Sequence, residues 1–129
     1  MHDIESLDDV KKMVDTFYHN VQKDDLLGPI FNSVIENKWP EHLAKMYGFW
    51  QSILLNEPAY SGRPFPPHMK LDVTKVHFER WVALFKANVD SNFAGPKADE
   101  AIARAKLMAA LFHSKIEHFK SQGPSLMDR

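Results

Sequence analysis

The sequence has no cysteine, which excludes a disulfide framework, a thiolate metal site, a cysteine nucleophile and covalent c-type haem attachment. Net charge is also small, because 16 basic residues are balanced by 17 acidic ones, so no broad field favours nucleic acid or an anionic membrane surface. No stretch approaches the roughly 18 apolar residues of a membrane span, and the N-terminus lacks the basic and apolar segments of a secretory signal. We therefore expect a soluble cytoplasmic protein without nucleic-acid or membrane partners.

The length of 129 residues suits a single domain, 1–129, that is large enough to bury a core. Apolar residues recur at spacings of three and four rather than two, which predicts an all-α fold. Ser6 is a candidate cap for the first helix, and Pro29 and Pro40 stand in the first turns of the next two. We expect long helices over about 7–22, 39–55, 72–89 and 97–119, a short one over 29–35, and a disordered tail over about 121–129.

His68 follows a proline pair at the end of a segment that has no regular pattern. The segment runs from Asn56 to Pro67 between two helical stretches, and loops of that length in a compact domain are commonly functional. The stiffness of the prolines would present the imidazole to whatever the neighbouring helices enclose. Taken alone, however, a histidine after a proline is more often an ordinary loop residue.

Three polar-tipped side chains stand on otherwise apolar helical faces. His42 precedes Met46 by four residues and Trp50 by eight, so its imidazole should point into the core, where it needs a partner. Tyr18 and Trp81 likewise bring a hydroxyl and an indole N–H to inward faces. Each residue taken alone has an ordinary explanation that is at least as good: His42 as a core histidine, Tyr18 as a tyrosine that reaches the surface, and Trp81 as a core tryptophan. Together with the loop histidine, they suit a cavity that holds a metal macrocycle.

A different kind of metal site is also conceivable in the last helix. His113 and Glu117 lie four residues apart and could form half of a carboxylate–histidine site, but no second such pair stands on a partner helix. A di-iron bundle is therefore disfavoured. A helical interaction module without any cofactor remains the alternative from another class.

Several short motifs follow one another at defined spacing. They are Phe17-Tyr18, Leu27-Gly28-Pro29-Ile30-Phe31, His42 with Phe49-Trp50, Tyr60-Ser61-Gly62 leading to His68, His77-Phe78-Glu79-Arg80-Trp81 with Leu84-Phe85, and Arg104-Ala105. In order and spacing the chain resembles a truncated haemoglobin of group III over about residues 7–118, and the lack of any Gly-Gly pair favours that group over groups I and II. The resemblance implies a globin-like two-over-two helical sandwich around a non-covalent haem b, with the proximal helix reduced to a turn.

The resemblance also implies roles for single residues. His68 would be the proximal ligand of the haem iron, Tyr18 and His42 would be distal residues, and Trp81 would be an indole donor of the pocket. Further haem contacts would come from Phe31, Leu43, Met46, Phe49, Trp50 and Phe78, with Tyr60 and Arg63 as partners of a haem propionate. His77 departs from the aromatic residue expected at its position, so it could approach the haem edge or compete for the iron.

The function implied is the binding of dioxygen, nitric oxide and carbon monoxide, because one neutral imidazole leaves the sixth position of haem iron open. Two or three hydrogen-bond donors beside such a ligand would slow its release by orders of magnitude. Slow release argues against bulk oxygen transport and favours an oxidoreductase, peroxidase-like or nitric oxide dioxygenase-like, served by an electron donor that the sequence does not identify. A haem-based sensor or ligand store is the alternative, and we expect a monomer.

Overall fold

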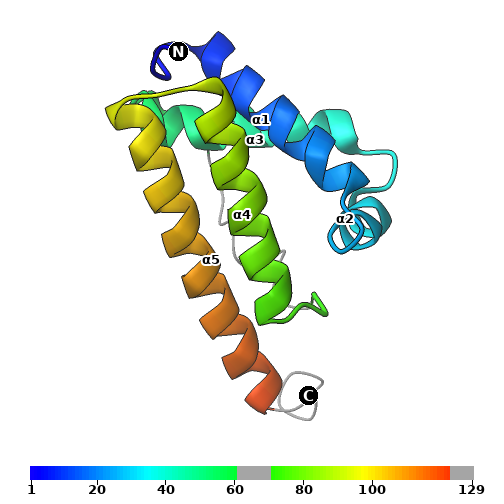
Figure 1. Cartoon of the computed structure of the whole chain (residues 1–129). Coiled ribbons are helices and arrows are strands. Elements are labelled where there is room, and N and C mark those ends of the chain that lie inside the picture. Colours follow the sequence, from blue (N-terminus) through cyan, green and yellow to red (C-terminus); the bar gives the residue numbers. More distant parts are fainter. Residues whose placement is uncertain (61–70, 123–129) are drawn as a thin grey trace.

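The computed structural model describes residues 1–60 and 71–122, and this part of the chain contains five helices and no strand (Figure 1). The helices are α1 (Leu7–Lys23), α2 (Gly28–Ile35), α3 (Trp39–Leu54), α4 (Lys75–Asn92) and α5 (Pro96–Gln122). The prediction of an all-α fold is therefore confirmed, and each expected helix is present. Within the described ranges, no helix is long and apolar enough to cross a membrane.

Three helix boundaries differ by three residues from the prediction: the start of α4, its end at Asn92 rather than near residue 89, and the end of α5. The fourth helix, α4, begins at Lys75 rather than near residue 72, because Thr74 has an extended backbone with φ −124° and ψ −178° and serves as the N-cap. At the other end of the chain, α5 continues through Gln122, so the start of the expected tail is helical. The rest of that tail, residues 123–129, lies outside the described residues.

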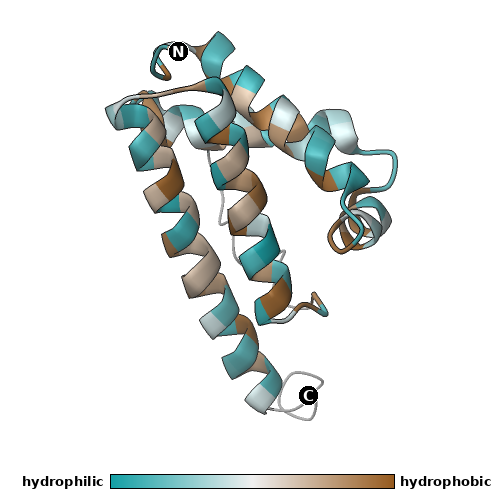
Figure 2. Cartoon of the chain, in the orientation of Figure 1, coloured by the Kyte–Doolittle hydropathy of each residue, from teal (hydrophilic) through white to brown (hydrophobic). Residues whose placement is uncertain are grey.

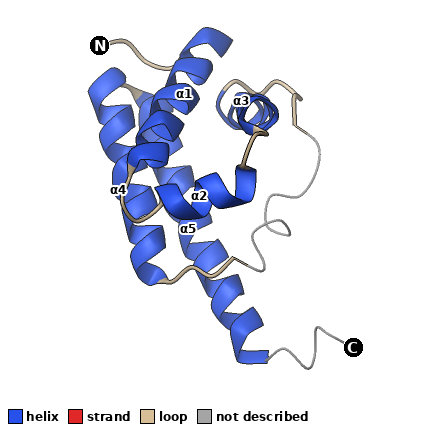
Figure 3. Cartoon of the chain, turned by 90° about the vertical axis from the view of Figure 1, so that its right-hand side faces the viewer, coloured by secondary structure: helices blue, strands red, loops and turns tan. Residues whose placement is uncertain are grey.

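The helices form two crossing pairs. The pair α4 and α5 lies side by side in opposite directions, α1 packs on α3, and the pairs meet where α1 crosses α4 and where α3 reaches α5 (Figures 1 and 3). The short helix α2 packs against α1. This is the two-over-two arrangement expected from the sequence.

Helix α1 begins as the sequence predicts. The Ser6 hydroxyl accepts a hydrogen bond from the Asp9 backbone N–H at 3.3 Å, and Asp8 and Asp9 place negative charge in the first turn, where it complements the helix dipole. The buried face repeats every three or four residues and consists of Val10, Met13, Val14, Phe17, Tyr18 and Val21. Figure 2 shows hydrophobic positions interspersed with hydrophilic ones along the helices.

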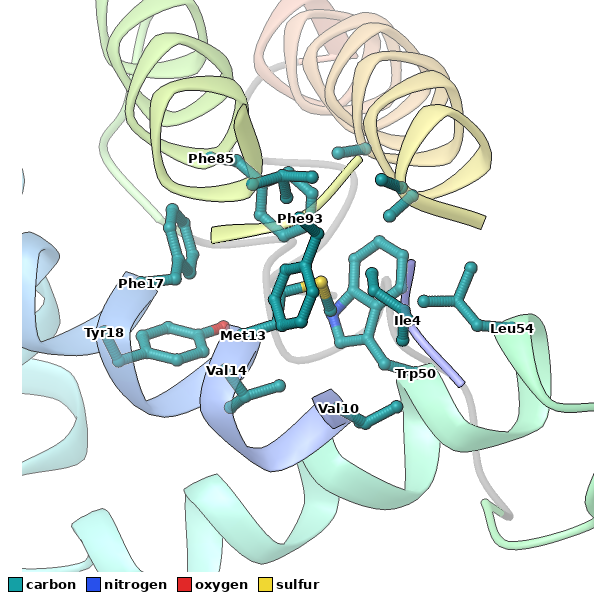
Figure 4. Packing of buried hydrophobic residues seen from close by; sticks show 14 of the residues in the cluster. Ile4, Val10, Met13, Val14, Phe17, Tyr18, Trp50, Leu54, Phe85 and Phe93 are labelled. Carbon is teal, nitrogen blue, oxygen red and sulfur yellow. The ribbon is translucent and has the colours of Figure 1, made fainter. Parts of the chain in front are cut away.

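The core centres on aromatic rings that join the two helix pairs (Figure 4). Phe85 of α4 lies 5.1 Å from Phe17 of α1, edge to face, and 5.1 Å from Trp50 of α3 in a stacked arrangement. Trp81 stacks on the same phenylalanine at 5.6 Å. Since such pairs add roughly 0.5–1.5 kcal/mol to the burial of their area, this cluster sets how the pairs cross.

The N-terminal segment holds the start of α5 from outside that helix. The Asp3 carboxylate accepts hydrogen bonds from the backbone N–H groups of Lys97 at 2.9 Å and Ala98 at 2.8 Å, and Ile4 is buried in the core. Burial alone would raise the pKa of Asp3, but the backbone hydrogen bonds outweigh it and lower the pKa. Gly95 permits this approach, because its φ is +141° and a Cβ there would lie 2.6 Å from the Asp3 Cγ.

Candidate functional site

A single cavity is bordered by all five helices and by the segment that leads into α4. Its described lining consists of Tyr18, Leu27, Ile30, Phe31, His42, Met46, Phe49, Trp50, Leu71, Val73, His77, Phe78, Trp81, Met108, Ala109, Phe112 and Ile116. None of these side chains is acidic, lysine or arginine. The described part of the cavity wall is therefore apolar, with polar side-chain groups only at a tyrosine, two histidines and two indoles.

Tyr18 brings a hydroxyl into this cavity from the middle of α1. The residue is only 6% exposed, and its side chain points into the packed cluster (Figure 4). Its ring makes edge-to-face contacts with Phe17 at 4.9 Å and with His42 at 5.0 Å. Burial raises the pKa of Tyr18 above its ordinary value of 10.0, so the hydroxyl keeps its proton at physiological pH and can donate a hydrogen bond.

His42 faces Tyr18 from the first turns of α3. Its ring lies perpendicular to the Tyr18 ring at 5.0 Å and to the Trp39 ring at 5.8 Å, and the residue is half-buried. The aromatic rings fix the orientation of the imidazole. Two polar tips from different helices, each expected on an inward face, thus meet at one side of the cavity.

Trp81 lines the cavity from α4. Its ring contacts Phe17 edge to face at 5.5 Å and stacks on Phe85, so the indole is held against the core by the pair of rings that join α1 to α4. The structure therefore brings Tyr18, His42 and Trp81 to one cavity. Their expected roles beside a bound ligand remain predictions.

The expected haem contacts are divided between cavity and core. Phe31, Met46, Phe49, Trp50 and Phe78 all line the cavity. Leu43 instead packs as a partly buried residue against the hydrophobic core, and Tyr60 sits beside the cavity wall, with its ring 5.2 Å from that of Phe49. Arg63 and His68 lie outside the described residues.

His77 occupies a position that the sequence left open. It lines the cavity at the start of α4, and its Nδ1 accepts a hydrogen bond from the Thr74 backbone N–H at 3.0 Å. The two residues form a capping box in which histidine takes the place that glutamate or glutamine usually holds. The ring is therefore anchored at one nitrogen.

Some of the lining was not predicted from the sequence. Leu71 lies in the irregular segment before α4, where no periodicity marks an inward face, whereas Val73, which was expected to face inward from the fourth helix, lines the cavity from that segment. Leu27 and Ile30 belong to a motif quoted for the family resemblance but had no assigned role, and Met108 of α5 carried no signal. These residues complete the apolar wall.

An ion pair outside the cavity fixes the turn between α1 and α2 against α4. Asp24 accepts hydrogen bonds from the backbone N–H groups of Leu26 and Leu27, and Arg80 donates to its other oxygen at 2.6 Å. Burial would raise the pKa of Asp24, but these hydrogen bonds lower it. Leu27 donates to Asp24, Trp81 follows Arg80 in sequence, and both line the cavity, so the ion pair positions part of its wall.

The residues of the cavity fit a flat, mostly apolar macrocycle. Aromatic and aliphatic side chains can pack on its faces, while the few donors can address an axial ligand. Within residues 1–60 and 71–122, no three His, Cys, Asp or Glu side chains gather in a way that would hold a bare metal ion. His113 and Glu117 approach each other at 3.7 Å on α5, without further ligands in the described part of the chain.

Comparisons with known proteins agree with this geometry. Residues 3–115 match the family of bacterial-like globins. The chain is 33% identical over 111 residues to the Group 3 truncated hemoglobin ctb of Campylobacter jejuni, covering 83% of this chain and 87% of the relative. The crystal structure of a group III truncated hemoglobin from Campylobacter jejuni superposes with a TM-score of 0.80 at 32% identity, covering 87% of this chain and 91% of that one.

The fold, the cavity and the sequence relationship thus agree with one another. The chain belongs to the bacterial-like globins and, within them, to the group III truncated haemoglobins.

Proposed function

We propose that this globin holds haem b non-covalently in the cavity between its helices and binds dioxygen and other diatomic gases there. The observation that carries the proposal is the convergence of Tyr18, His42 and Trp81 on one otherwise apolar cavity. When bound, haem would supply an iron that can bind a protein imidazole and a diatomic gas. The residues of the chain then decide how the group is held and how long a ligand stays.

His68 is the proposed axial ligand of the iron. The two described residues that flank the segment 61–70, Tyr60 and Leu71, both adjoin the cavity. Tyr60 contacts Phe49, and Leu71 is part of the lining. His68 precedes Leu71 by three residues, and three residues of chain span at most about 11 Å. The length of the chain is thus compatible with a ligand role for His68 in this cavity.

The opposite side of the site would be formed by the Tyr18 hydroxyl, the His42 imidazole and the Trp81 indole N–H. Each can donate a hydrogen bond to an electron-rich diatomic ligand, and the apolar wall around them excludes water that would compete. Phe31 and Phe49 supply aromatic faces that can pack on the macrocycle. Arg63 and Tyr60 are proposed partners of a propionate.

An absorption spectrum of the purified protein tests the proposal. We expect a Soret band and, in the ferrous protein, a shift of that band with carbon monoxide. The variant His68→Ala should lose stable haem or retain a loosely held haem that added imidazole restores, whereas His77→Ala should keep the wild-type spectra. A wild-type protein without a Soret band would leave a cofactor-free helical module, and unchanged spectra in His68→Ala would overturn the ligand assignment.

We further propose that the site carries out oxidative chemistry rather than oxygen transport. Donors from three helices would hold dioxygen tightly, and tight binding suits reaction with nitric oxide or peroxide. Consumption of nitric oxide by the ferrous protein with dioxygen, and peroxide-dependent oxidation of a reporter substrate, should exceed those of free haem. Both activities should fall in Tyr18→Phe and Trp81→Phe. Turnover equal to that of free haem, and insensitive to both substitutions, would indicate a ligand sensor or store.

A further inference from the structure

His77 lines the cavity, and its side chain also takes part in the capping box at the start of α4. The Thr74 backbone N–H donates to the His77 Nδ1 at 3.0 Å, and the Thr74 Oγ1 lies 3.2 Å from the same nitrogen. A backbone N–H is only a donor, so Nδ1 must present its lone pair. The capping box therefore determines which ring nitrogen carries the proton.

A neutral imidazole has one nitrogen with a proton and one without. With Nδ1 as the acceptor for Thr74, the proton of His77 resides on Nε2, at the far edge of the ring. A nitrogen that carries a proton has no lone pair for iron, so ligation through Nε2 would require the cap to break. The cap thus turns His77 from a candidate ligand into a hydrogen-bond donor at the cavity wall.

The surroundings of His77 favour an anionic acceptor. The described lining contains no carboxylate, and the first turn of α4 contains no acidic residue. The positive end of the helix dipole is therefore not neutralised by a side chain of α4 itself. Lys120 of α5 adds positive charge at the same end, because its Nζ donates to the carbonyl oxygen of Val73 at 2.9 Å. Lys120 also forms an ion pair with Asp72, whose exposed carboxylate lies 3.9 Å from the Lys120 Nζ.

We propose that the capping box of α4 holds His77 as an Nε2–H donor that binds a propionate carboxylate of the haem, and not its iron. The propionates are the anionic groups at the periphery of haem, and a charge-assisted hydrogen bond to one of them would fix the cofactor in one orientation. This inference rests on the proposed binding of haem in the same cavity. It assigns to His77 a role in positioning the cofactor.

Two substitutions at position 77 separate the donor from the cap. His77→Glu restores the usual capping box but removes the N–H donor and adds a negative charge, while His77→Gln keeps both an acceptor for Thr74 and an N–H donor. His113→Gln serves as the matched control, because His113 stands on α5 outside the cavity lining. Thermal unfolding of each apoprotein verifies that the helix cap is retained.

The rate of haem loss to an excess of a haem-scavenging apoprotein is then compared for haem and for its dimethyl ester, which has no anionic carboxylate. We expect His77→Glu to lose haem about tenfold faster than wild type, and His77→Gln and His113→Gln to stay within about threefold. With the dimethyl ester, wild type and His77→Glu should differ by less than about twofold. If the rate of loss from His77→Glu relative to wild type were the same for haem and for its dimethyl ester, the proposed contact with a carboxylate would be overturned.

The protonated nitrogen can be observed without any cofactor. Nitrogen NMR of the apoprotein should show the proton of His77 on Nε2, and a proton on Nδ1 would refute the role of the cap. Changed ferrous spectra in His77→Gln would show that His77 binds the iron after all. If wild type retained neither form of haem, the proposed function and the carboxylate contact would both be wrong, while the NMR result would still decide the state of the ring.

Discussion

Replacing Tyr18 with phenylalanine removes one hydroxyl from the cavity and leaves the aromatic ring in place. Phenylalanine retains the ring that contacts Phe17 and His42, and Tyr18 is buried among α1, α2 and α3 side chains. We therefore expect the free energy of unfolding to change by less than about 0.5 kcal/mol, since no packing is lost. The effect should appear on ligand release instead.

A net hydrogen bond of roughly 1 kcal/mol corresponds to about a fivefold change in a dissociation rate, and a charge-assisted one to more. Stopped-flow measurement of dioxygen release from the ferrous protein should thus show an increase of about fivefold or more in Tyr18→Phe. Because burial raises the pKa of Tyr18 above 10.0, the hydroxyl stays protonated below that pH. The difference between wild type and variant should accordingly persist from pH 6 to pH 9.

Tyr47→Phe provides a matched control on α3. The Tyr47 hydroxyl bonds to Asp15 outside the cavity lining, and burial together with that hydrogen bond raises its pKa to about 12. Its removal should leave dioxygen release unchanged. Equal rates in wild type, Tyr18→Phe and Tyr47→Phe would refute the reasoning that places the Tyr18 hydroxyl beside the ligand.

Further predictions concern the other donors and the start of α5. Trp81→Phe should also speed dioxygen release by about fivefold in the same stopped-flow assay. His42→Leu should change the rate of ligand entry, because the imidazole would gate the cavity. Unchanged rates in both variants would leave the fold intact but contradict hydrogen bonding of the ligand by these side chains. Asp3→Ala should lower the free energy of unfolding by about 1 kcal/mol through loss of the α5 cap, measured by urea denaturation. Because the pKa of Asp3 is lowered in the folded state, this contribution is present above its ordinary value of 3.8 and is lost as the pH falls through the folded value, so the variant should show a weaker acid dependence. Gly95→Ala should destabilise by at least about 1 kcal/mol, since it strains a positive φ and meets Asp3; an unchanged midpoint would contradict that geometry.

The sequence predicts those features that depend on neighbours along the chain. Ser6 caps α1 through the N–H of a residue three positions on, and the prolines near the starts of α2 and α3 act within a single turn. Tyr18, His42 and Trp81 could be placed on inward faces because helical spacing determines which side chains share a face. The lining of the cavity includes all three residues, but the spacing within each helix could not show that they meet there.

Features that depend on distant residues could not be predicted in this way. Asp3 caps α5 through the backbone N–H of Lys97, 94 residues later in the sequence, and nothing local marks it as a cap. The capping box of Thr74 and His77 is local, but a histidine in place of glutamate or glutamine gave no usual signal. Leu71 lines the cavity from an irregular segment, where hydrophobic periodicity has no meaning.

The central claim, that the apolar cavity holds haem, is tested most directly by titrating haem into the apoprotein. Trp50 and Trp81 line the cavity, and Trp39 lies 5.8 Å from the Tyr18 ring, so all three tryptophans adjoin the site and their fluorescence would be quenched by a bound macrocycle. We predict that the Soret absorbance and the loss of tryptophan emission both saturate at one equivalent of haem. A Soret absorbance that rises linearly past one equivalent of haem, with tryptophan emission unchanged, would contradict the binding of haem in this cavity.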